Sequence, residues 1–118
     1  MFSLNESDRF VLCMQGVDLR KGIDGLCGCI RQLSLLPTSG DVYVFVNKNR
    51  NTMKLVHWER GGFVIYHKRL ESGRLTHKIF QGKGVRFGIL RWDELLLLIE
   101  GISPKTRRRK RYNLEQKK

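Results

Sequence analysis

The sequence predicts an α+β fold, with an antiparallel β-meander of about four to six strands packed against a helix from the N-terminal half and a short C-terminal helix. Three observations support this prediction. Apolar residues recur at helical spacing between residues 23 and 33. Short β-branched and aromatic segments, separated by polar or glycine turns, then follow one another from residue 42. A last apolar segment, residues 92–100, begins with acids and ends at a glycine.

The N-terminal third is predicted to hold one strand and one helix. Residues 9–15 are apolar enough for a first strand, and Asp18 is a residue type that often caps a helix N-terminus. The apolar residues that follow occupy one helical face: Ile23, Leu26, Cys27, Ile30 and Leu33. Pro37 and Gly40 then indicate a loop.

The middle of the chain is predicted to be the meander. Residues 42–46 form a continuous apolar run, which is typical of a central strand. Further strands are expected at residues 53–58, 63–70, 75–80 and 85–90, with a tight turn at Gly61-Gly62.

A helix over residues 92–100 is expected to close the domain. Asp93 and Glu94 would lie in its first turn, where acids favour the positive helix end, and Gly101 would terminate it. We therefore expect one domain over residues 1–103 and a basic, disordered tail over residues 104–118.

Positive charge is concentrated in two stretches. Residues 47–86 carry ten Lys/Arg against two acids, and residues 105–118 carry eight against one, while the whole chain has a net charge of +12. Charge segregated in this way predicts a polyanionic partner, with a nucleic acid favoured over a membrane, an acidic protein or a merely solvated surface. The candidate phosphate contacts are Arg20, Lys21, Lys48, Arg50, Lys54, Arg60, Lys68, Arg69, Lys105, Arg107, Arg108, Arg109, Lys110 and Arg111.

Two features allow alternative interpretations. Gly22, Gly25 and Gly28 recur every third residue, which indicates close packing of the helix on the sheet or, as the weaker alternative, close approach of a phosphate. Trp58 and Tyr66 lie beside basic residues, so they would either stack on bases or pack across strands, whereas packing is favoured for Phe63.

Neither metal binding nor catalysis is expected. Cys27 and Cys29 would point apart on a helix, and His57, His67 and His77 lack the spacing of a metal site. The acids are scattered without a catalytic motif, so we expect no catalytic residue and no cofactor. No segment reaches the roughly 18 apolar residues of a membrane span, and the odd set of three cysteines favours a reducing, cytoplasmic location.

Several segments resemble a known family. Asp18-Leu19-Arg20-Lys21-Gly22-Ile23-Asp24-Gly25-Leu26 resembles the Asp-Met-Arg-Lys-Gly-Phe-Asp-Gly-Leu signature of the second-open-reading-frame accessory proteins of IS66-type insertion sequences. Residues 40–47, with Trp58-Glu59 and Gly61-Gly62-Phe63, resemble the second block of that family, and residues 95–102 its closing helix. The residues that match the motifs most directly are Asp18, Gly22, Asp24, Gly25, Gly40, Asp41, Trp58, Glu59, Gly61 and Gly62.

The resemblance implies an accessory role in bacterial transposition, beside a separate transposase protein of the same element. Combined with the charge distribution, it predicts a non-catalytic accessory protein that contacts DNA phosphates through a basic sheet face and a basic C-terminal arm. The alternative is a protein-interaction adaptor for the transposase without direct DNA binding. A small metal-dependent nuclease is the third hypothesis.

Overall fold

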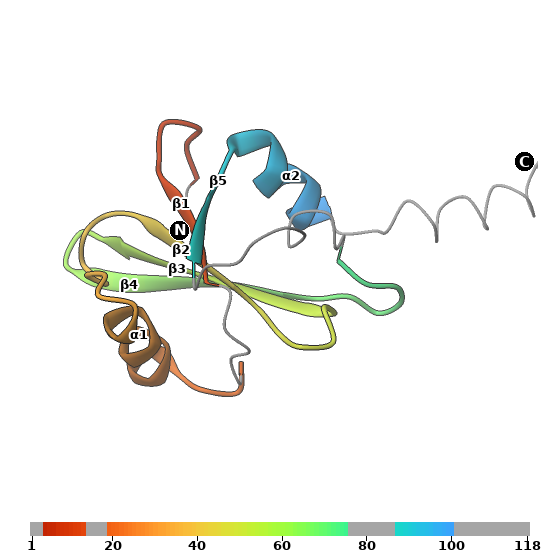
Figure 1. Cartoon of the computed structure of the whole chain (residues 1–118), viewed down its shortest axis with the longest axis horizontal. Helices are drawn as coiled ribbons and strands as arrows, with labels where there is room; N and C mark the ends of the chain where they lie inside the picture. Colours follow the sequence, from red (N-terminus) through yellow and green to blue (C-terminus); the bar gives the residue numbers. More distant parts are fainter. Residues whose placement is uncertain (1–3, 14–18, 76–86, 101–118) are drawn as a thin grey trace, which may run out of the picture.

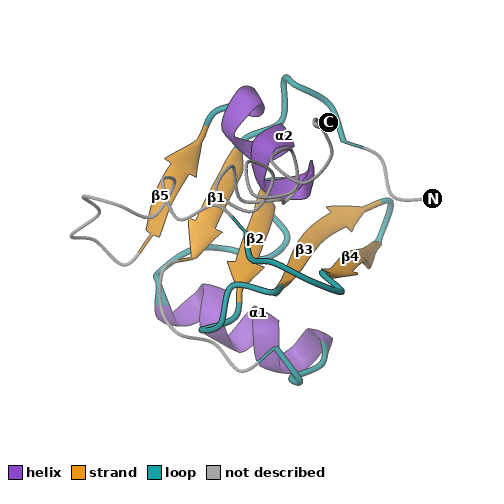
Figure 2. Ribbon diagram, turned by 90° about the vertical axis from the view of Figure 1, so that its right-hand side faces the viewer, coloured by secondary structure: helices purple, strands orange, loops and turns teal. Residues whose placement is uncertain are grey.

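The computed structural model describes residues 4–13, 19–75 and 87–100, and its elements form a sheet between two helices (Figure 1). In chain order the elements are β1 (Phe10–Cys13), α1 (Ile23–Gln32), β2 (Val42–Val46), β3 (Thr52–Glu59), β4 (Gly62–Arg69), β5 (Phe87–Leu90) and α2 (Trp92–Glu100). Figure 2 shows α1 on one face of the sheet and α2 on the other.

The sheet has the strand order β4-β3-β2-β1-β5. The antiparallel meander is confirmed for β2, β3 and β4, and β5 pairs antiparallel with β1. β1 and β2, however, run parallel, with Phe10 opposite Val42 and Cys13 opposite Phe45. The α+β fold is thus confirmed with a mixed sheet, because the connection through α1 returns the chain to the same end of the sheet.

Each face of the sheet has its own hydrophobic cluster. Leu26 and Ile30 of α1 pack with Phe45 and Val56 on one face, whereas Leu95 and Leu98 of α2 pack on the other face with strand residues that include Phe10. All five residues of β2 are buried, since β2 is central and covered on both sides. This explains why its sequence is apolar throughout rather than alternating.

α1 begins later than the sequence predicts. Gly22 occupies the N-cap position and makes no side-chain capping bond, so the expected cap by Asp18, which itself lies outside the described residues, is wrong. The packing interpretation of the glycines is also wrong in the described part of the chain. An added Cβ at Gly22 or Gly28 would meet nothing within 4 Å, and at Gly25 it would meet Cβ of Lys21 at 2.8 Å, not the sheet.

The β3–β4 hairpin turns one residue earlier than expected. Arg60 and Gly61 form a two-residue turn with φ of 50° and 81°, and Gly62 already pairs with Glu59 as the first residue of β4. Two consecutive positive φ values are typical of the type I′ turn, whose twist matches that of the strands. Gly61 is therefore the glycine that this turn requires.

The remaining expected elements are partly described. The strand expected at residues 85–90 is seen as β5, and the helix expected at residues 92–100 is confirmed as α2. The strand expected at residues 75–80 lies outside the described residues except for Leu75, which is buried. Gly101 and the expected tail, residues 104–118, also lie outside them.

Candidate nucleic-acid interface

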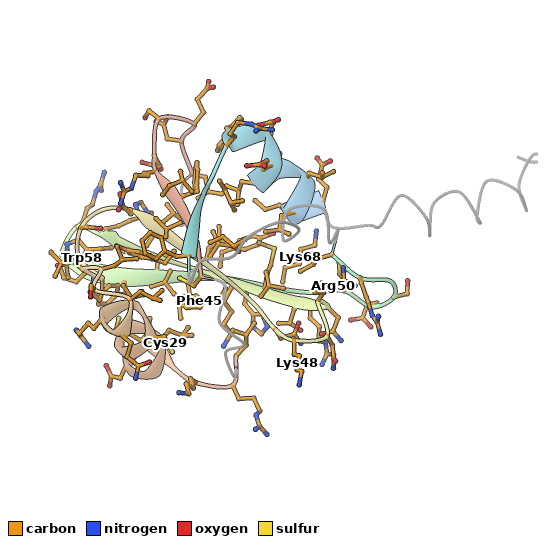
Figure 3. All side chains as sticks on the ribbon, viewed as in Figure 1. Cys29, Phe45, Lys48, Arg50, Trp58 and Lys68 are labelled. Carbon is orange, nitrogen blue, oxygen red and sulfur yellow. The ribbon has the colours of Figure 1, made fainter. Side chains whose placement is uncertain are left out.

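Alternation along β3 and β4 places a row of polar side chains on the face that α1 covers. Val56 and Ile65 pack with α1 on this face, so Lys54 and His67, which pair across the two strands, lie on the same face. The next pair toward the β2–β3 turn on this face is Thr52 and Arg69. Figure 3 shows Lys48 and Trp58 at opposite ends of the sheet, with α1 below the Trp58 end. The polar row therefore extends beyond the helix.

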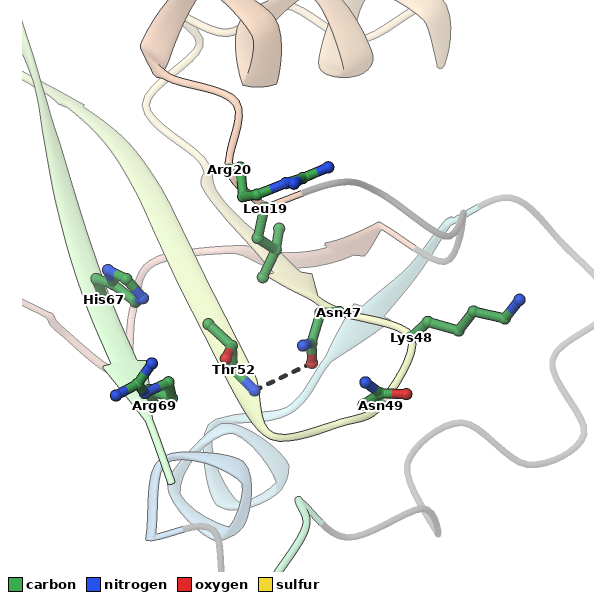
Figure 4. A pocket seen from close by; sticks show the side chains of 8 residues that line it. All are labelled: Leu19, Arg20, Asn47, Lys48, Asn49, Thr52, His67 and Arg69. Carbon is green, nitrogen blue, oxygen red and sulfur yellow. Dashed lines mark hydrogen bonds between the residues drawn. The ribbon is translucent and has the colours of Figure 1, made fainter. Parts of the chain in front are cut away.

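A hollow of about 430 Å³ lies at the end of the sheet that α1 leaves uncovered. The segment before α1, the β2–β3 turn and the end of β4 form its walls (Figure 4). The described residues that line it are Leu19, Arg20, Asn47, Lys48, Asn49, Thr52, His67 and Arg69. Arg20, Lys48 and Arg69 are exposed at its rim, and none of its described lining residues is Asp or Glu. Three cations therefore converge on a hollow whose described lining holds no acidic side chain. We call it the basic hollow.

Asn47 fixes the conformation of the β2–β3 turn, which forms one wall of the hollow. Its Oδ1 accepts hydrogen bonds from the backbone N–H groups of Asn51 and Thr52, both at 3.0 Å, and its Nδ2 donates to Oδ1 of Asn51 at 2.6 Å (the bond to Thr52 is drawn in Figure 4). The Arg50 N–H also donates to the carbonyl of Asn47 at 3.0 Å. The turn that carries Lys48 and Asn49 is consequently fixed by its own hydrogen bonds.

Lys54 fixes a second wall of the hollow, the segment that leads into α1. Its Nζ donates to the carbonyl oxygen of Leu19 at 2.6 Å, and Leu19 is buried against the α1 side of the sheet. This bond ties the segment that leads into α1, including Arg20, to the centre of β3. In the described structure Lys54 therefore positions that segment.

The other predicted cations of the folded part are not gathered at the basic hollow. Lys68 lies on the α2 face, where its ammonium donates to the carbonyl of Ile99 near the end of α2. Arg50 donates from Nη1 to the carbonyl of Leu75 at 3.1 Å. Arg60 lies in the hairpin turn at the opposite end of β3 and β4, and Lys21 lies against Gly25 of α1. The residues of the basic tail, from Lys105 to Arg111, are outside the described residues.

Sequence reasoning missed five of the lining residues, namely Leu19, Asn47, Asn49, Thr52 and His67. From the sequence, His67 is one of three histidines that lack the spacing of a metal site, and the turn is only a connection between strands. The signal that could have identified His67 and Thr52 is their period-two spacing from Arg69 and Lys54. Finding the hollow itself requires the pairing register of β3 with β4.

The aromatic side chains of the meander pack against protein. The rings of Trp58 and Phe63 meet edge to face across the hairpin, with 4.8 Å between centroids, which confirms the packing interpretation for both. Tyr66 packs against the cluster on the α2 face.

The cysteines and acids form no recognisable reactive site in the described residues. Burial, with a smaller contribution from Cys29, raises the pKa of Cys13 to about 12, and burial also raises the pKa of Cys27. Within residues 4–13, 19–75 and 87–100, no three His, Cys, Asp or Glu side chains are grouped so that they could hold a metal ion. His77 is not among those residues.

Comparison with known proteins identifies the family. The model of the family described as IS66 Orf2-like protein matches residues 8–109. The chain belongs to this family. It is also 31% identical over 97 residues to the uncharacterized protein y4jC of Sinorhizobium fredii. The matched segment covers 80% of this chain and 79% of that relative. No solved structure matches the chain.

The second motif block of the IS66 Orf2-like family consists largely of structural residues in this chain. Gly40 has φ of 95° and its carbonyl faces Nε2 of His57 at 3.1 Å, while Nδ1 of His57 lies 2.8 Å from Oε2 of Glu59. Asp41 forms an ion pair with Arg9 at 3.2 Å. Gly40 and Glu59, from separate parts of the motif, are thus linked through one histidine.

Membership of the IS66 Orf2-like family supports a transposition-associated accessory role for this chain. Neither described helix is long and apolar enough to cross a membrane.

Proposed function

We propose that this accessory protein contacts DNA phosphates through the basic hollow and through its basic C-terminal segment. The observation that carries the proposal is the convergence of three exposed cations, Arg20, Lys48 and Arg69, around a hollow whose described lining holds no acid. They come from three separate segments, so the fold, and not local sequence, gathers them. Such a surface attracts phosphates and positions a nucleic acid without reading its sequence.

Residues 105–118 add eight Lys/Arg against one acid. If the hollow and this segment together neutralise about six phosphates, the logarithm of the binding constant falls against the logarithm of salt concentration with a slope near −5. Fluorescence anisotropy with labelled duplexes of element-end and random sequence, measured in rising salt, tests this. Absence of binding to both duplexes at low salt would disprove DNA contact.

A matched pair of double variants tests whether the hollow is the site. Lys48→Gln with Arg69→Gln removes two cations from the hollow, and Arg31→Gln with Arg60→Gln removes two exposed cations from the end of α1 and the far hairpin turn. We expect the first variant to weaken duplex binding about tenfold or more at low salt and to reduce the salt slope by about 2. The second variant should bind within about twofold of the original chain. Equal losses of affinity in both variants would mean that only net charge matters.

A second candidate function is an adaptor that binds the transposase protein of the same element. It is supported by Leu96 and Leu97 on α2, which are 39% and 40% exposed and adjacent. Replacing both leucines with serine should abolish co-purification with the transposase and leave DNA affinity unchanged. Retained co-purification would reject this surface as the docking site.

A further inference from the structure

We propose that the basic hollow accommodates a single unpaired nucleotide of DNA, such as one at a frayed or extended end, in preference to a paired one. The inference rests on the proposed DNA contact and specifies which part of the DNA the site holds.

The shape of the hollow favours an unpaired nucleotide. Its volume of about 430 Å³ lies in the range of small-ligand pockets, roughly 300–1,000 Å³. A duplex is a convex cylinder, so its backbone can touch the rim but cannot enter a hollow of this size. A base that has left the stack can enter while its phosphate stays among Arg20, Lys48 and Arg69.

The chemistry of the walls fits the same occupant. The His67 imidazole and the Arg69 guanidinium, two residues apart on β4, are planar groups of the kind on which unstacked bases lie. Asn49 on the turn offers an amide that both donates and accepts hydrogen bonds, as a base edge does. Leu19 adds apolar surface. A phosphate alone would use the cations and leave these other groups without a function.

The walls are fixed before any ligand binds. Asn47 holds the turn, Lys54 holds the segment at Leu19, and the Leu70 N–H donates to the carbonyl of Asn51 at 2.8 Å just beyond Arg69. A preformed site loses less conformational entropy on binding than one that must be ordered. The described walls of the hollow are therefore preorganised for a ligand.

The test compares a short blunt duplex with the same duplex carrying a few unpaired nucleotides at one end, by fluorescence anisotropy with the full chain. We expect the extended duplex to bind about tenfold more tightly, the effect of stacking one base. His67→Ala should remove that preference, so that the two duplexes bind with similar affinity. His67→Phe, which keeps a flat ring, should retain it.

Asn49→Ala provides a second variant, because Asn49 is exposed on the turn and its removal should reduce the preference with little effect on folding. Thermal unfolding of each variant verifies that the chain is folded. Equal binding of the two duplexes, or a preference that survives His67→Ala, overturns the inference while leaving DNA contact intact. Binding of neither duplex overturns both proposals.

Discussion

Lys54 is a basic side chain that stabilises the fold through a hydrogen bond to the protein backbone. Its ammonium donates a bond of 2.6 Å to the Leu19 carbonyl in a partly buried position. Lys54→Met keeps the aliphatic length and leaves that carbonyl without its donor. We expect the free energy of unfolding to fall by about 1–2 kcal/mol in urea titrations, because a partly buried acceptor loses a charge-assisted bond.

Lys48→Met is the matched control for Lys54→Met. Lys48 is exposed at the tip of the turn, so the same substitution there should leave stability within about 0.5 kcal/mol. DNA affinity, in contrast, should fall more for Lys48→Met than for Lys54→Met. A stability unchanged by Lys54→Met would show that this bond contributes nothing.

The three cysteines should differ sharply in reactivity. Burial raises the pKa of Cys13 to about 12, and burial raises the pKa of Cys27, whereas Cys29 is only half-buried. The thiolate is the reactive form, and at about pH 8 a thiol with so high a pKa stays protonated. Iodoacetamide followed by mass spectrometry should therefore modify Cys29 first in the folded chain.

Unfolding in urea removes the burial that protects Cys13 and Cys27, so all three cysteines should then react at similar rates. If Cys13 reacted as fast as Cys29 in the folded protein, the burial assigned to β1 would be wrong.

At the scale of elements, α2 carries a testable capping interaction at its N-terminus. The Arg91 N–H donates to Oε1 of Glu94 at 2.9 Å, and Nε of Arg91 donates to Asp93 at 3.1 Å. The carboxylates also lie at the positive end of the helix dipole. Glu94→Ala should lower the free energy of unfolding by about 0.5–1 kcal/mol.

Glu100→Ala is the control for Glu94→Ala within the same helix. Glu100 is exposed at the last residue of α2, where a negative charge opposes the dipole, so its removal should leave stability unchanged or slightly higher. Equal destabilisation by both substitutions in thermal unfolding would indicate an effect on helix propensity or packing and not on capping.

Local signals predicted individual elements better than their arrangement. α2 matches its expected bounds because acids at one end and Gly101 at the other delimit its apolar segment. α1 starts at Ile23, where the apolar spacing starts, although Asp18 is the better capping residue type. The parallel pairing of β1 with β2 is not among the expectations from the sequence, yet a helix between two neighbouring strands permits it. The length of the connection was the signal that could have predicted it.

The candidate site was only partly predictable for the same reason. Charge alone identifies Lys48, Arg69 and Arg20, but it equally identifies Lys68 and Arg60, which lie on the other face and at the other end of the sheet. To separate the two groups, one must know on which face of the sheet each strand residue lies and how the strands are paired. To predict the hollow, one must also know the conformation of the turn around Asn47, which depends on side-chain hydrogen bonds.

At the scale of the whole molecule, the second basic stretch, residues 105–118, lies outside the part of the chain that supplies the described core residues. The two clusters that hold α1 and α2 on the sheet use described residues between Leu4 and Ile99. Residues 104–118 contain a net charge of +7 and little apolar content. The contribution of residues 104–118 to DNA affinity should therefore be separable from folding by truncation.

A chain that ends at residue 103 tests this separation. Its thermal unfolding midpoint should stay within a few degrees of that of the full chain, because all the described core residues remain. Its affinity for duplex DNA at low salt should fall, because fewer phosphates are neutralised. Its salt slope should become shallower by about 0.9 for each phosphate that residues 104–118 bind in the full chain.

Two comparisons make the outcome decisive. The preference of the truncated chain for unpaired ends should persist, since it resides in the basic hollow and not in residues 104–118. Adding Lys48→Gln with Arg69→Gln to the truncated chain should then remove most of the remaining affinity, because both groups of cations would be reduced. A truncated chain that binds duplex with undiminished affinity and slope would place the whole electrostatic interaction on the folded domain.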